Sequence, residues 1–314
     1  MKRENSPVSE QPVPSGEDRA TQLGSNHDRH NGRRGLDPSQ LSVVVCTKNR
    51  PEYLGLALLG LAAQEDRPGE VVVSDAGEPA TEVVDRAREA TDLNIKHCCF
   101  ANEGFRLAVT RNVGASNATG EWLVFIDGDI VLLPGAIGCH ARHATDAFTA
   151  LAGGRTMLDR ELSGQVTKEA ISSKAIEGML TADEIRCLHW EHRRNRLYDL
   201  IRHRKRPHLH GHQFSLSKRL FRAVNGFDEN YVGWGAEDVD FRDRIVRKGA
   251  RIRSLVGFAI GIHLWHPMHS TIPEKGAPLQ SQGYHDGSRL RPAFCADGVD
   301  KHIAGTGTGQ RGAR

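Results

Sequence analysis

Between residues 41 and 127, short apolar runs rich in β-branched residues alternate with stretches of helical periodicity. Each apolar run predicts a buried strand, and the four runs are 41–47, 70–75, 93–100 and 121–127. The helical stretches between them open at Pro51, cover 79–91 and extend over about 103–118. Near-continuous apolar strands that alternate with helices are typical of a parallel sheet covered on both faces. This part of the chain therefore predicts an α/β fold.

The pattern is less regular after residue 130. The elements predicted there are helical periodicity over 168–204, a short strand near 212–217, a helix over about 236–248 and a strand near 251–260. The outer segments, 1–39 and 270–314, are rich in Ser, Pro, Gly and charged residues and contain little to bury. We expect both to be disordered tails. The prediction is one folded domain over 40–269.

Composition is that of an ordinary soluble protein, since 38% of the 314 residues are hydrophobic and 26% are charged. The formal net charge of +3 is too small over this length to argue for nucleic-acid binding. No apolar run approaches the roughly 20 residues that span a bilayer, and the N-terminal segment lacks the apolar core of a secretory signal. We therefore expect a cytoplasmic protein without a transmembrane segment. Its six cysteines include no Cys-x-x-Cys pair, and we expect them to be reduced.

The strongest local signal is the sequence Phe-Ile-Asp-Gly-Asp that ends the fourth predicted strand. Ligands of open α/β sheets bind beyond the carboxyl ends of the strands, where Asp127 and Asp129 lie. Two carboxylates this close repel each other unless a cation or donor groups lie between them. Mg²⁺ or Mn²⁺ takes such oxygen ligands and can bridge a carboxylate to a diphosphate. The alternative is a polar turn, because Asp-Gly is also a common turn dipeptide.

Four segments of the chain resemble family 2 glycosyltransferases, in that family's order. Residues 102–129 resemble the stretch from a donor-binding helix into the Asp-x-Asp turn, and 42–54 are similar to the first strand and nucleotide-binding loop. Residues 73–77 resemble the second strand, which ends in a base-contacting aspartate. Residues 226–249 resemble the Gly-Trp-Gly-x-Glu-Asp segment shared by bacterial chondroitin-type polymerases and animal galactosyltransferases. Together these segments cover most of 41–269.

The resemblance implies a GT-A fold with a nucleotide-binding half over 40–130 and an acceptor half over 131–269. It implies that Thr47 and Arg50 line the nucleotide pocket and that Asp75 contacts the base. It further implies that Arg106 and Arg111 lie near the diphosphate or the donor sugar, and that Asp127 contacts the ribose. It also implies a divalent cation, Mn²⁺ or Mg²⁺, held by Asp127, Asp129 and His263. The expected donor is a nucleotide diphosphate sugar, with uridine preferred over guanosine or thymidine forms.

In the same resemblance, Asp238 matches the general base, and Trp234 and Glu237 hold the acceptor. His212 precedes a predicted strand that is expected to border the acceptor site. A base acting opposite the leaving diphosphate inverts the anomeric centre, while the cation and the arginines stabilise the developing negative charge. The expected acceptor is a hydroxyl of a glycan, a lipid-linked intermediate or a secondary metabolite. Single-sugar addition is favoured, because the transmembrane helices and Gln-x-x-Arg-Trp motif of processive relatives are missing.

Simpler structural interpretations exist for several of these residues. Asp238 opens a predicted helix, where an acid is favoured by the helix dipole whether or not it takes part in catalysis. Arg111 fits a surface helix position, and His263 fits a core or loop histidine. The basic run 192–206 fits a solvated helix face. Its functional alternative is a docking surface for an anionic acceptor or an anionic membrane.

Three other functions compete with sugar transfer. The first is a non-catalytic nucleotide-sugar-binding protein. The second is a zinc-dependent hydrolase that uses His208, His210, His212, His263 and His266. The third is a sugar nucleotidyltransferase, a class with a Gly- and Arg-rich loop directly after the first strand. The corresponding loop here reads CTKNRPEYL, which departs from that pattern.

Overall fold

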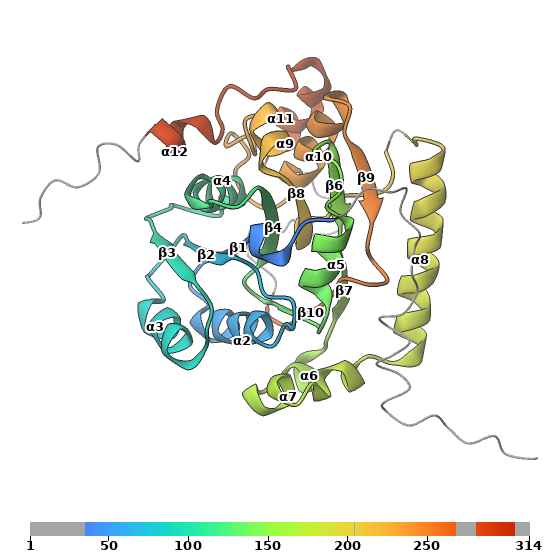
Figure 1. The fold of residues 1–314 in the computed structure, drawn as a ribbon. Helices are drawn as coiled ribbons and strands as arrows, with labels where there is room; N and C mark the ends of the chain where they lie inside the picture. The colour runs from blue at the N-terminus through green and yellow to red at the C-terminus, as the bar shows by residue number, and fades with distance from the viewer. Residues whose placement is uncertain (1–34, 204, 268–280, 305–314) are drawn as a thin grey trace, which may run out of the picture. The chain divides into compact units, whose positions relative to one another are not determined.

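The computed structural model describes residues 35–203, 205–267 and 281–304. Within these residues, seven strands form the central sheet in the order β3-β2-β1-β4-β8-β6-β9 (Figure 1). Their bounds are β1 (Leu41–Thr47), β2 (Glu70–Asp75), β3 (Ile95–Cys99), β4 (Trp122–Asp127), β6 (Thr149–Ala152), β8 (Gln213–Ser217) and β9 (Arg251–Ser254). Strands β3, β2, β1 and β4 are parallel, and β8 runs antiparallel to both β4 and β6. The predicted, mostly parallel sheet is thus present.

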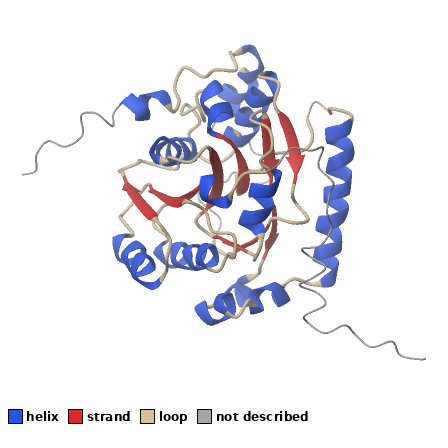
Figure 2. Ribbon diagram, viewed as in Figure 1, coloured by secondary structure: helices blue, strands red, loops and turns tan. Residues whose placement is uncertain are grey.

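Helices cover both faces of this sheet (Figure 2). One face packs against α2 (Pro51–Ala62), α3 (Thr81–Ala90) and α5 (Ala136–His143). The other face packs against α4 (Leu107–Asn117), α9 (Lys218–Ala223) and α10 (Glu237–Arg247). Alternate strand residues serve the two cores, because successive side chains of a strand point to opposite faces. In β1, for example, Val43 and Val45 belong to the first core and Val44 to the second.

A second, smaller sheet places part of the site. It consists of β5 (Ile130–Leu132), β10 (Ile260–His263) and β7 (Gly154–Met157), with β10 in the middle. β10 pairs antiparallel with β5, so that His263 lies opposite Ile130. The Leu264 amide donates to the Asp129 carbonyl at 3.0 Å and continues this pairing. The small sheet thereby brings the end of β10 to the turn that follows β4.

The remaining elements lie at the edges of the domain. They are η1 (Pro38–Gln40), α6 (Arg160–Ser163), α7 (Lys168–Ser172), η2 (Ala175–Met179), α8 (Ala182–Leu200), α11 (Gln282–Asp286), η3 (Ser288–Leu290) and α12 (Asp300–Ala304). Helix α8 packs beside β9 at the end of the central sheet (Figure 1). Among the described residues, no helix combines the length and the apolar character needed to cross a bilayer.

The expected C-terminal tail over 270–314 is wrong for residues 281–304, which are folded against the domain. Val299 and Cys295 are buried, and the Val299 amide donates to the Asn225 carbonyl at 2.9 Å. The Tyr284 hydroxyl donates to Asp228 at 2.7 Å. A few anchoring residues and backbone hydrogen bonds therefore order a segment of polar composition. The rest of this tail lies outside the described residues.

The expected disordered N-terminal tail over 1–39 extends too far along the chain, because its last residues belong to the folded domain. The structure describes residues from Gly35 onward, and the Leu36 amide donates to the Ala141 carbonyl at 3.0 Å. Asp37 caps η1 by accepting a hydrogen bond from the Ser39 amide at 2.9 Å. The folded part therefore begins before the predicted boundary at residue 40. Residues 1–34 lie outside the described residues.

The predicted strand at 251–260 is also wrong, because the chain forms two strands that belong to different sheets. β9 ends at Ser254 in the central sheet, and β10 begins at Ile260 in the small one. The amides of Phe258 and Ala259 both donate to the Leu255 carbonyl, which closes a turn between the strands. The apolar side chains of this turn made it resemble a continuation of the strand.

Candidate functional site

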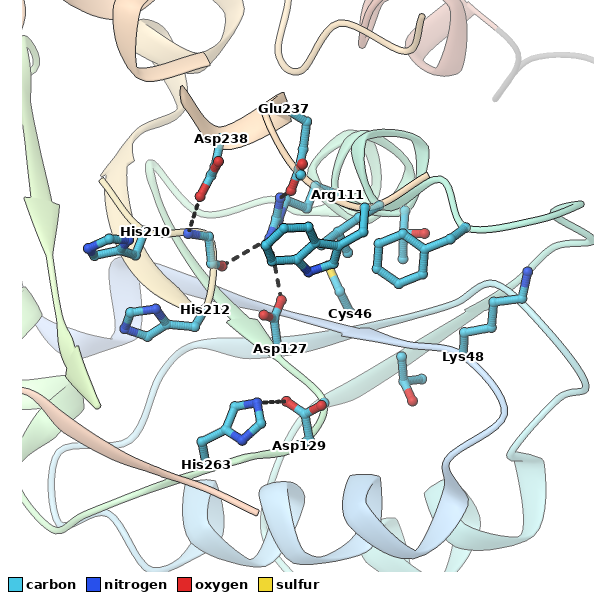
Figure 3. A pocket seen from close by; sticks show the side chains of 18 of the residues that line it. Cys46, Lys48, Arg111, Asp127, Asp129, His210, His212, Glu237, Asp238 and His263 are labelled. Carbon is cyan, nitrogen blue, oxygen red and sulfur yellow. Dashed lines mark hydrogen bonds and ion pairs between the residues drawn. The ribbon is translucent and has the colours of Figure 1, made fainter. Parts of the chain in front are cut away.

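A cavity of about 1200 Å³ opens beyond the carboxyl ends of β1 and β4 (Figure 3). Its walls come from the loop after β1, the start of α4, the turn after β4, the segment before β8, the start of α10 and the end of β10. The residues expected at the site that line this cavity are Thr47, Arg50, Arg106, Arg111, Asp127, Asp129, His212, Trp234, Glu237, Asp238 and His263. Asp75 is not among the lining residues. The fold thus gathers all but one of the expected residues into one place.

Asp129, His263 and His266 form a cluster on one wall of this cavity. Their ligand atoms all lie within 4.8 Å of one another. His263 Nε2 is 3.7 Å from Asp129 Oδ1, and His266 Nε2 is 3.2 Å from Asp129 Oδ2. Two buried atoms, Asp129 Oδ1 and His263 Nδ1, have no hydrogen-bond partner among the described residues. One carboxylate and two imidazoles in this arrangement fit a divalent cation.

His266 is the member of this cluster that the resemblance did not assign to the metal. It follows His263 by three residues, just beyond β10. The Tyr53 hydroxyl donates to the Trp265 carbonyl at 2.9 Å and the Trp265 amide donates to Ser163 at 2.7 Å, so this segment is anchored on both sides. The sequence signal was present, since two histidines three residues apart follow a strand. It was attributed to a zinc-dependent hydrolase instead.

The five histidines of that hydrolase hypothesis do not assemble around one point. His263 and His266 join Asp129, whereas His208, His210 and His212 form a separate row. Ring centroids in this row are 5.3 Å apart for the first pair and 5.6 Å for the second. Among the described residues, no group of potential metal ligands includes a member of the row. The five-histidine arrangement is therefore wrong.

Arg50 contacts the cluster of Asp129, His263 and His266 directly. Its Nη1 lies 2.7 Å from Asp129 Oδ2, and its Nη2 lies 3.2 Å from His266 Nδ1. Burial acts to raise the pKa of Asp129, but the hydrogen bond from His266 and the nearby charges of His263 and Arg50 lower it below its ordinary value. The pKa of His263 is lowered because its side chain is buried. Asp129 is therefore ionised near pH 7, which is the form that binds metal. The hydrogen bond to Asp129 raises the pKa of His266, so that His266 must release a proton when a cation binds.

Arg111 is a buried cation at the centre of the site, so the surface-residue interpretation is wrong. Its Nη1 lies 3.0 Å from Glu237 Oε1, and its Nη2 lies 3.4 Å from Asp127 Oδ1 and 3.1 Å from the Gly211 carbonyl (Figure 3). Its guanidinium carbon lies 4.9 Å from the centre of the Phe227 ring. The side chain therefore connects three segments that are far apart in the sequence. Arg111 positions the other side chains of the site.

Asp127 lies beside this arginine rather than in the metal cluster. Its carboxylate is not among the ligand atoms that converge at Asp129. Its amide donates to the His212 carbonyl at 3.1 Å, which fixes the turn after β4 against the segment before β8. Burial raises the pKa of Asp127 to about 7, although the charge of Arg111 acts to lower it. The metal-ligand role expected for Asp127 thus has no support in the geometry of this site.

The opposite wall of the cavity is built by the sequence Gly-Trp-Gly-Ala at the start of α10. Gly233, Gly235 and Ala236 have φ angles of 81°, 92° and 73°, in the left-handed region. Glycine adopts this region without strain, so the first two positions explain the motif in terms of backbone geometry. Between them, Trp234 is 42% exposed and lines the cavity. The turn thus presents a large aromatic ring to whatever occupies the cavity.

Glu237 and Asp238 follow this turn and differ in environment. Glu237 is buried, and its Oε2 has no hydrogen-bond partner among the described residues. Burial, together with the neighbouring charge of Asp238, raises the pKa of Glu237. Asp238 is half-buried, and its Oδ2 accepts a hydrogen bond from the Gly211 amide at 3.2 Å. Figure 3 shows Asp238 across the cavity from Asp129, so the two carboxylates face one shared space.

His212 is enclosed behind this space. It is 7% exposed, its Nε2 has no hydrogen-bond partner among the described residues, and burial lowers the pKa of its side chain well below the ordinary value. His210 and Arg155, which the sequence interpretation did not include in the cavity, line it as well. A neutral imidazole with an unused nitrogen can donate to or accept from a polar ligand.

Arg106 and Asp75 are held by contacts within the fold. The Arg106 Nη2 donates to the Glu229 carbonyl at 2.9 Å, while its Nε has no hydrogen-bond partner among the described residues. Asp75 Oδ2 accepts from the Ala80 amide at 2.7 Å and lies 3.1 Å from His97 Nε2. Its Oδ1 is buried without a hydrogen-bond partner among the described residues. Both side chains therefore have unused hydrogen-bonding capacity.

Comparison with known proteins gives two family matches. Residues 42–224 match the model of glycosyl transferase family 2, and residues 192–267 match that of the N-terminal domain of galactosyltransferase. The chain is 30% identical to a chondroitin synthase of Escherichia coli, over 72% of this chain and 35% of that protein. It is 31% identical to a validoxylamine A glucosyltransferase of Streptomyces hygroscopicus subsp. limoneus, over 67% of this chain and 48% of that protein. It thus spans less than half the length of each.

Solved structures of similar fold extend over most of the chain. A mannosyltransferase from Pyrobaculum calidifontis, in complex with GDP-Man and Mn²⁺, has a TM-score of 0.50 at 16% identity, covering 94% of this chain and 71% of that one. GalNAc-T7 with UDP, GalNAc and Mn²⁺ has a TM-score of 0.53 at 15% identity, covering 79% and 47%. These likenesses confirm the GT-A fold. Because the family 2 model matches more than half of the chain, on this fold, the chain belongs to glycosyl transferase family 2.

Proposed function

We propose that the protein is an inverting, metal-dependent glycosyltransferase that moves a sugar from a nucleotide diphosphate sugar to an acceptor hydroxyl. The observation that carries this proposal is the shared cavity, with the Asp129 cluster on one wall and Asp238 on the other. A leaving diphosphate is stabilised by positive charge beside it. The attacking hydroxyl needs a base, which for inversion lies on the side of the sugar opposite the diphosphate. Family membership and the enzymes among the relatives support the same reaction class.

The cation proposed for this site is held by Asp129, His263 and His266. Their donor set of two nitrogens and one oxygen favours Mn²⁺ over Mg²⁺, because Mg²⁺ prefers oxygen ligands alone. The bound cation neutralises negative charge on the diphosphate. Asp129 is also the residue that Arg50 contacts. Arg50 therefore supplies positive charge next to the cluster, where the phosphates of the donor are expected to lie.

The donor is proposed to be a uridine diphosphate sugar, bound along the carboxyl ends of β1 and β2. Thr47 lines the cavity at the end of β1 and pairs in register with Asp75 at the end of β2. The Asp75 Oδ1 without a hydrogen-bond partner is suited to accept from the N–H of a base. Arg106 lines the cavity, and its Nε has no hydrogen-bond partner among the described residues. UDP and GDP-Man are present in the solved structures of similar fold, so both nucleotides belong in the test.

Asp238 is proposed to take the proton of the acceptor hydroxyl. Its Oδ2 is fixed by the Gly211 amide, and the same Gly211 is held through its carbonyl by Arg111. This connection sets the position of the base relative to Asp127 and the turn after β4. Base catalysis by a positioned carboxylate contributes roughly 10²–10⁴-fold to turnover. Attack from the Asp238 side, opposite the diphosphate, inverts the anomeric centre.

The acceptor is proposed to be a sugar or other polyol whose ring packs on Trp234. The indole is 42% exposed in the cavity wall and offers an aromatic face. His212 and Glu237 each have an unpartnered polar atom among the described residues of the same region, suited to bind hydroxyl groups. Glycans, lipid-linked intermediates and secondary metabolites all present such groups. Because a chondroitin synthase and a validoxylamine A glucosyltransferase are among the relatives, glycans and secondary metabolites are both included as test acceptors.

The exposed side of α8 is proposed to dock on an anionic membrane surface. This α8 surface consists of Trp190, Arg193, Leu197, Leu200 and Ile201, in and directly after the helix. The exposed fractions of its apolar members range from 55% for Leu197 to 76% for Leu200. An exposed helix face that combines large apolar side chains with arginine is typical of interfacial helices. The buried residues Leu188 and His192 occupy the inner side.

Vesicle sedimentation tests the α8 surface. Wild-type protein is expected to bind vesicles that contain phosphatidylglycerol and to remain in solution with pure phosphatidylcholine. Arg193→Glu combined with Leu200→Ser is expected to abolish binding, while Arg86→Glu, an equal charge change on exposed α3, leaves it unchanged. Binding that survives the double change contradicts the proposal. If the double variant still binds vesicles but loses affinity for an anionic acceptor, the α8 surface binds the acceptor and not a membrane.

The function itself is tested by incubating the chain with UDP-, GDP- and TDP-sugars, Mn²⁺ and a panel of acceptors. Transfer of the sugar with an inverted anomeric configuration, observed by NMR of the product, is the expected result. If the chain binds a donor but neither transfers its sugar to any acceptor nor hydrolyses it, the protein is a non-catalytic nucleotide-sugar-binding protein. Retention of configuration would contradict the role of Asp238 as a base.

A further inference from the structure

A second group of metal-ligating side chains lies outside the cavity, at the carboxyl ends of β2 and β3. The Asp75 carboxylate, the His97 imidazole and the Cys99 thiol each offer one ligand atom, and these atoms all lie within 4.8 Å of one another. His97 Nε2 is 3.1 Å from Asp75 Oδ2 and 3.2 Å from Cys99 Sγ. The cavity lining includes none of these three residues. The group is therefore separate from the Asp129 cluster.

Parallel pairing of the two strands creates this group. Asp75 lies opposite Cys99 in the register, and His97 lies two residues before Cys99. Side chains two residues apart in a strand point to the same face, so His97 and Cys99 project together. Cys98 projects to the other face, where it packs against the apolar core beneath α4. The strand thus supplies a matched control residue beside the cysteine of interest.

The contacts converge in the way that metal ligands do. Both short contacts of His97 involve the same nitrogen, Nε2. A thiol–imidazole–carboxylate relay uses the two ring nitrogens, one for each partner. Tetrahedral zinc, with bonds of about 2.0–2.3 Å to nitrogen, oxygen and sulfur, separates its ligand atoms by roughly 3.3–3.6 Å. The separations at His97 need to change by only a few tenths of an ångström to reach that geometry.

The burial and the hydrogen bonding of these three side chains also favour a bound ion. Asp75 is fully buried, and its Oδ1 has no hydrogen-bond partner among the described residues. The Ala80 amide donates to Oδ2, the oxygen that lies 3.1 Å from His97 Nε2, and so holds the carboxylate in place beside the imidazole. The His97 side chain is 6% exposed, whereas Cys99 is exposed. The open side at Cys99 gives an ion access from solvent and leaves a fourth position for water.

We propose that Asp75, His97 and Cys99 form a second metal site, of the zinc class, distinct from the Asp129 cluster. A thiolate, an imidazole and a carboxylate together select zinc, whereas the nitrogen and oxygen donors at Asp129 suit Mn²⁺. When the ion binds, the Cys99 thiol releases its proton to solvent and the sulfur coordinates as a thiolate. No oxidant or other reactant takes part.

A regulatory consequence follows, and this step rests on the proposed function. If Asp75 accepts a hydrogen bond from the base of the donor, the same carboxylate cannot bind zinc at full strength. Zinc at β2 and β3 and the nucleotide in the cavity then exclude each other. Zinc is thus an inhibitor that competes with the donor, from a site that contains no residue of the catalytic wall.

Cobalt(II) is the probe for this site, because a thiolate bound to cobalt gives a strong near-ultraviolet charge-transfer band. Nitrogen and oxygen ligands give no such band, so the Asp129 cluster does not contribute. The full chain is titrated with Co²⁺ as wild type, Cys99→Ser and Cys98→Ser. The band is expected in wild type and Cys98→Ser and absent from Cys99→Ser, with one equivalent of Zn²⁺ removing it. Absence from wild type, or persistence in Cys99→Ser, overturns the proposal.

Two further measurements separate this site from the proposed donor site. His97→Ala is expected to weaken Co²⁺ binding by at least about tenfold, and unchanged binding overturns the site. UDP with Mn²⁺ is expected to abolish the band, and a band that persists with UDP bound overturns the competition alone. UDP binding to Cys99→Ser is measured in parallel by calorimetry. If no form of the chain binds UDP, the donor assignment fails while the cobalt result still decides the metal site.

Discussion

Arg111 Nη1 lies 3.0 Å from Glu237 Oε1, and this ion pair joins two walls of the cavity. Arg111 belongs to α4 and Glu237 begins α10. Both side chains are buried, and Asp127 lies on the other side of the same guanidinium. The relative position of the turn after β4 and the start of α10 therefore depends on one cation.

Arg111→Met is expected to destabilise the fold by about 3–5 kcal/mol, because it leaves the buried Glu237 carboxylate and the partly buried Asp127 carboxylate without a counter-charge. The free energy of unfolding is measured with urea. Adding Glu237→Gln to Arg111→Met is expected to restore part of the loss. The control is Arg86→Met, which breaks an exposed pair with Glu82 and is expected to cost less than about 1 kcal/mol. Equal losses for the two arginines would contradict the positioning role of Arg111.

His266→Ala is expected to weaken Mn²⁺ binding by at least about tenfold, because it removes one of the three proposed ligands. His263→Ala has the same expected effect. Free Mn²⁺ is measured by electron paramagnetic resonance during a titration without nucleotide. His210→Ala serves as control, since His210 lines the cavity but lies outside the cluster. Mn²⁺ affinity that falls with His210→Ala and not with His266→Ala would place the cation elsewhere.

Arg50→Ala is expected to change metal and donor binding in opposite directions. Arg50 Nη1 lies 2.7 Å from Asp129 Oδ2, so the guanidinium and the cation compete for that carboxylate. Removing the pair, which is partly exposed, is expected to raise Mn²⁺ affinity by up to about fivefold. Donor affinity is expected to fall, because a positive charge near the diphosphate is lost. A loss of both affinities would show that Arg50 assists the cation rather than competing with it.

Glu70 gives a pH-dependent prediction far from the cavity. Burial acts to raise its pKa, but hydrogen bonds from Lys96, Ser42 and Thr119 lower the pKa of Glu70 to about 2, from an ordinary value of 4.5. A lowered pKa in the folded state contributes stability above pH 4.5, and this contribution is lost as the pH falls from 4.5 towards 2.

Glu70→Gln is therefore expected to lower the free energy of unfolding at pH 7 by about 2 kcal/mol. It is also expected to flatten the dependence of stability on pH between 4.5 and 2. Glu82→Gln, on the exposed face of α3, is the control and is expected to change neither quantity. Urea unfolding at several pH values measures both. A Glu70→Gln profile as steep as that of wild type would contradict the assigned pKa.

The sequence predicted β1, β2 and β4 well because these strands are buried on both faces, whereas β6 of the central sheet was missed. Strands β1 and β2 have the bounds that were predicted, since their apolar runs begin and end abruptly. The small sheet was missed because β5, β7 and β10 are three or four residues long. Runs of that length do not distinguish a strand from a turn, and pairing between distant segments decides their structure. The folded segment 281–304 was missed for a related reason, since its few anchors are recognised only by their partners.

The candidate site was predicted in part for a similar reason. Asp129, Trp234 and Asp238 stand in motifs of several residues, and they line one cavity as expected. The pairing of Arg50 with Asp129 and of Arg111 with Glu237 depends on how the loop after β1 and helix α10 fold back on the sheet. Nothing in the local sequence around either arginine specifies its partner.

The measurement that tests the central claim most directly compares Asp238→Asn with Asp129→Asn in Mn²⁺-dependent sugar transfer. Asp238→Asn is expected to lower kcat by about 10²–10⁴-fold while the Kd of the donor stays close to that of wild type. Asp129→Asn is expected to lose Mn²⁺ binding and donor binding together. Near-normal turnover of Asp238→Asn, or turnover of the wild type that survives complete removal of divalent cations, would contradict the account.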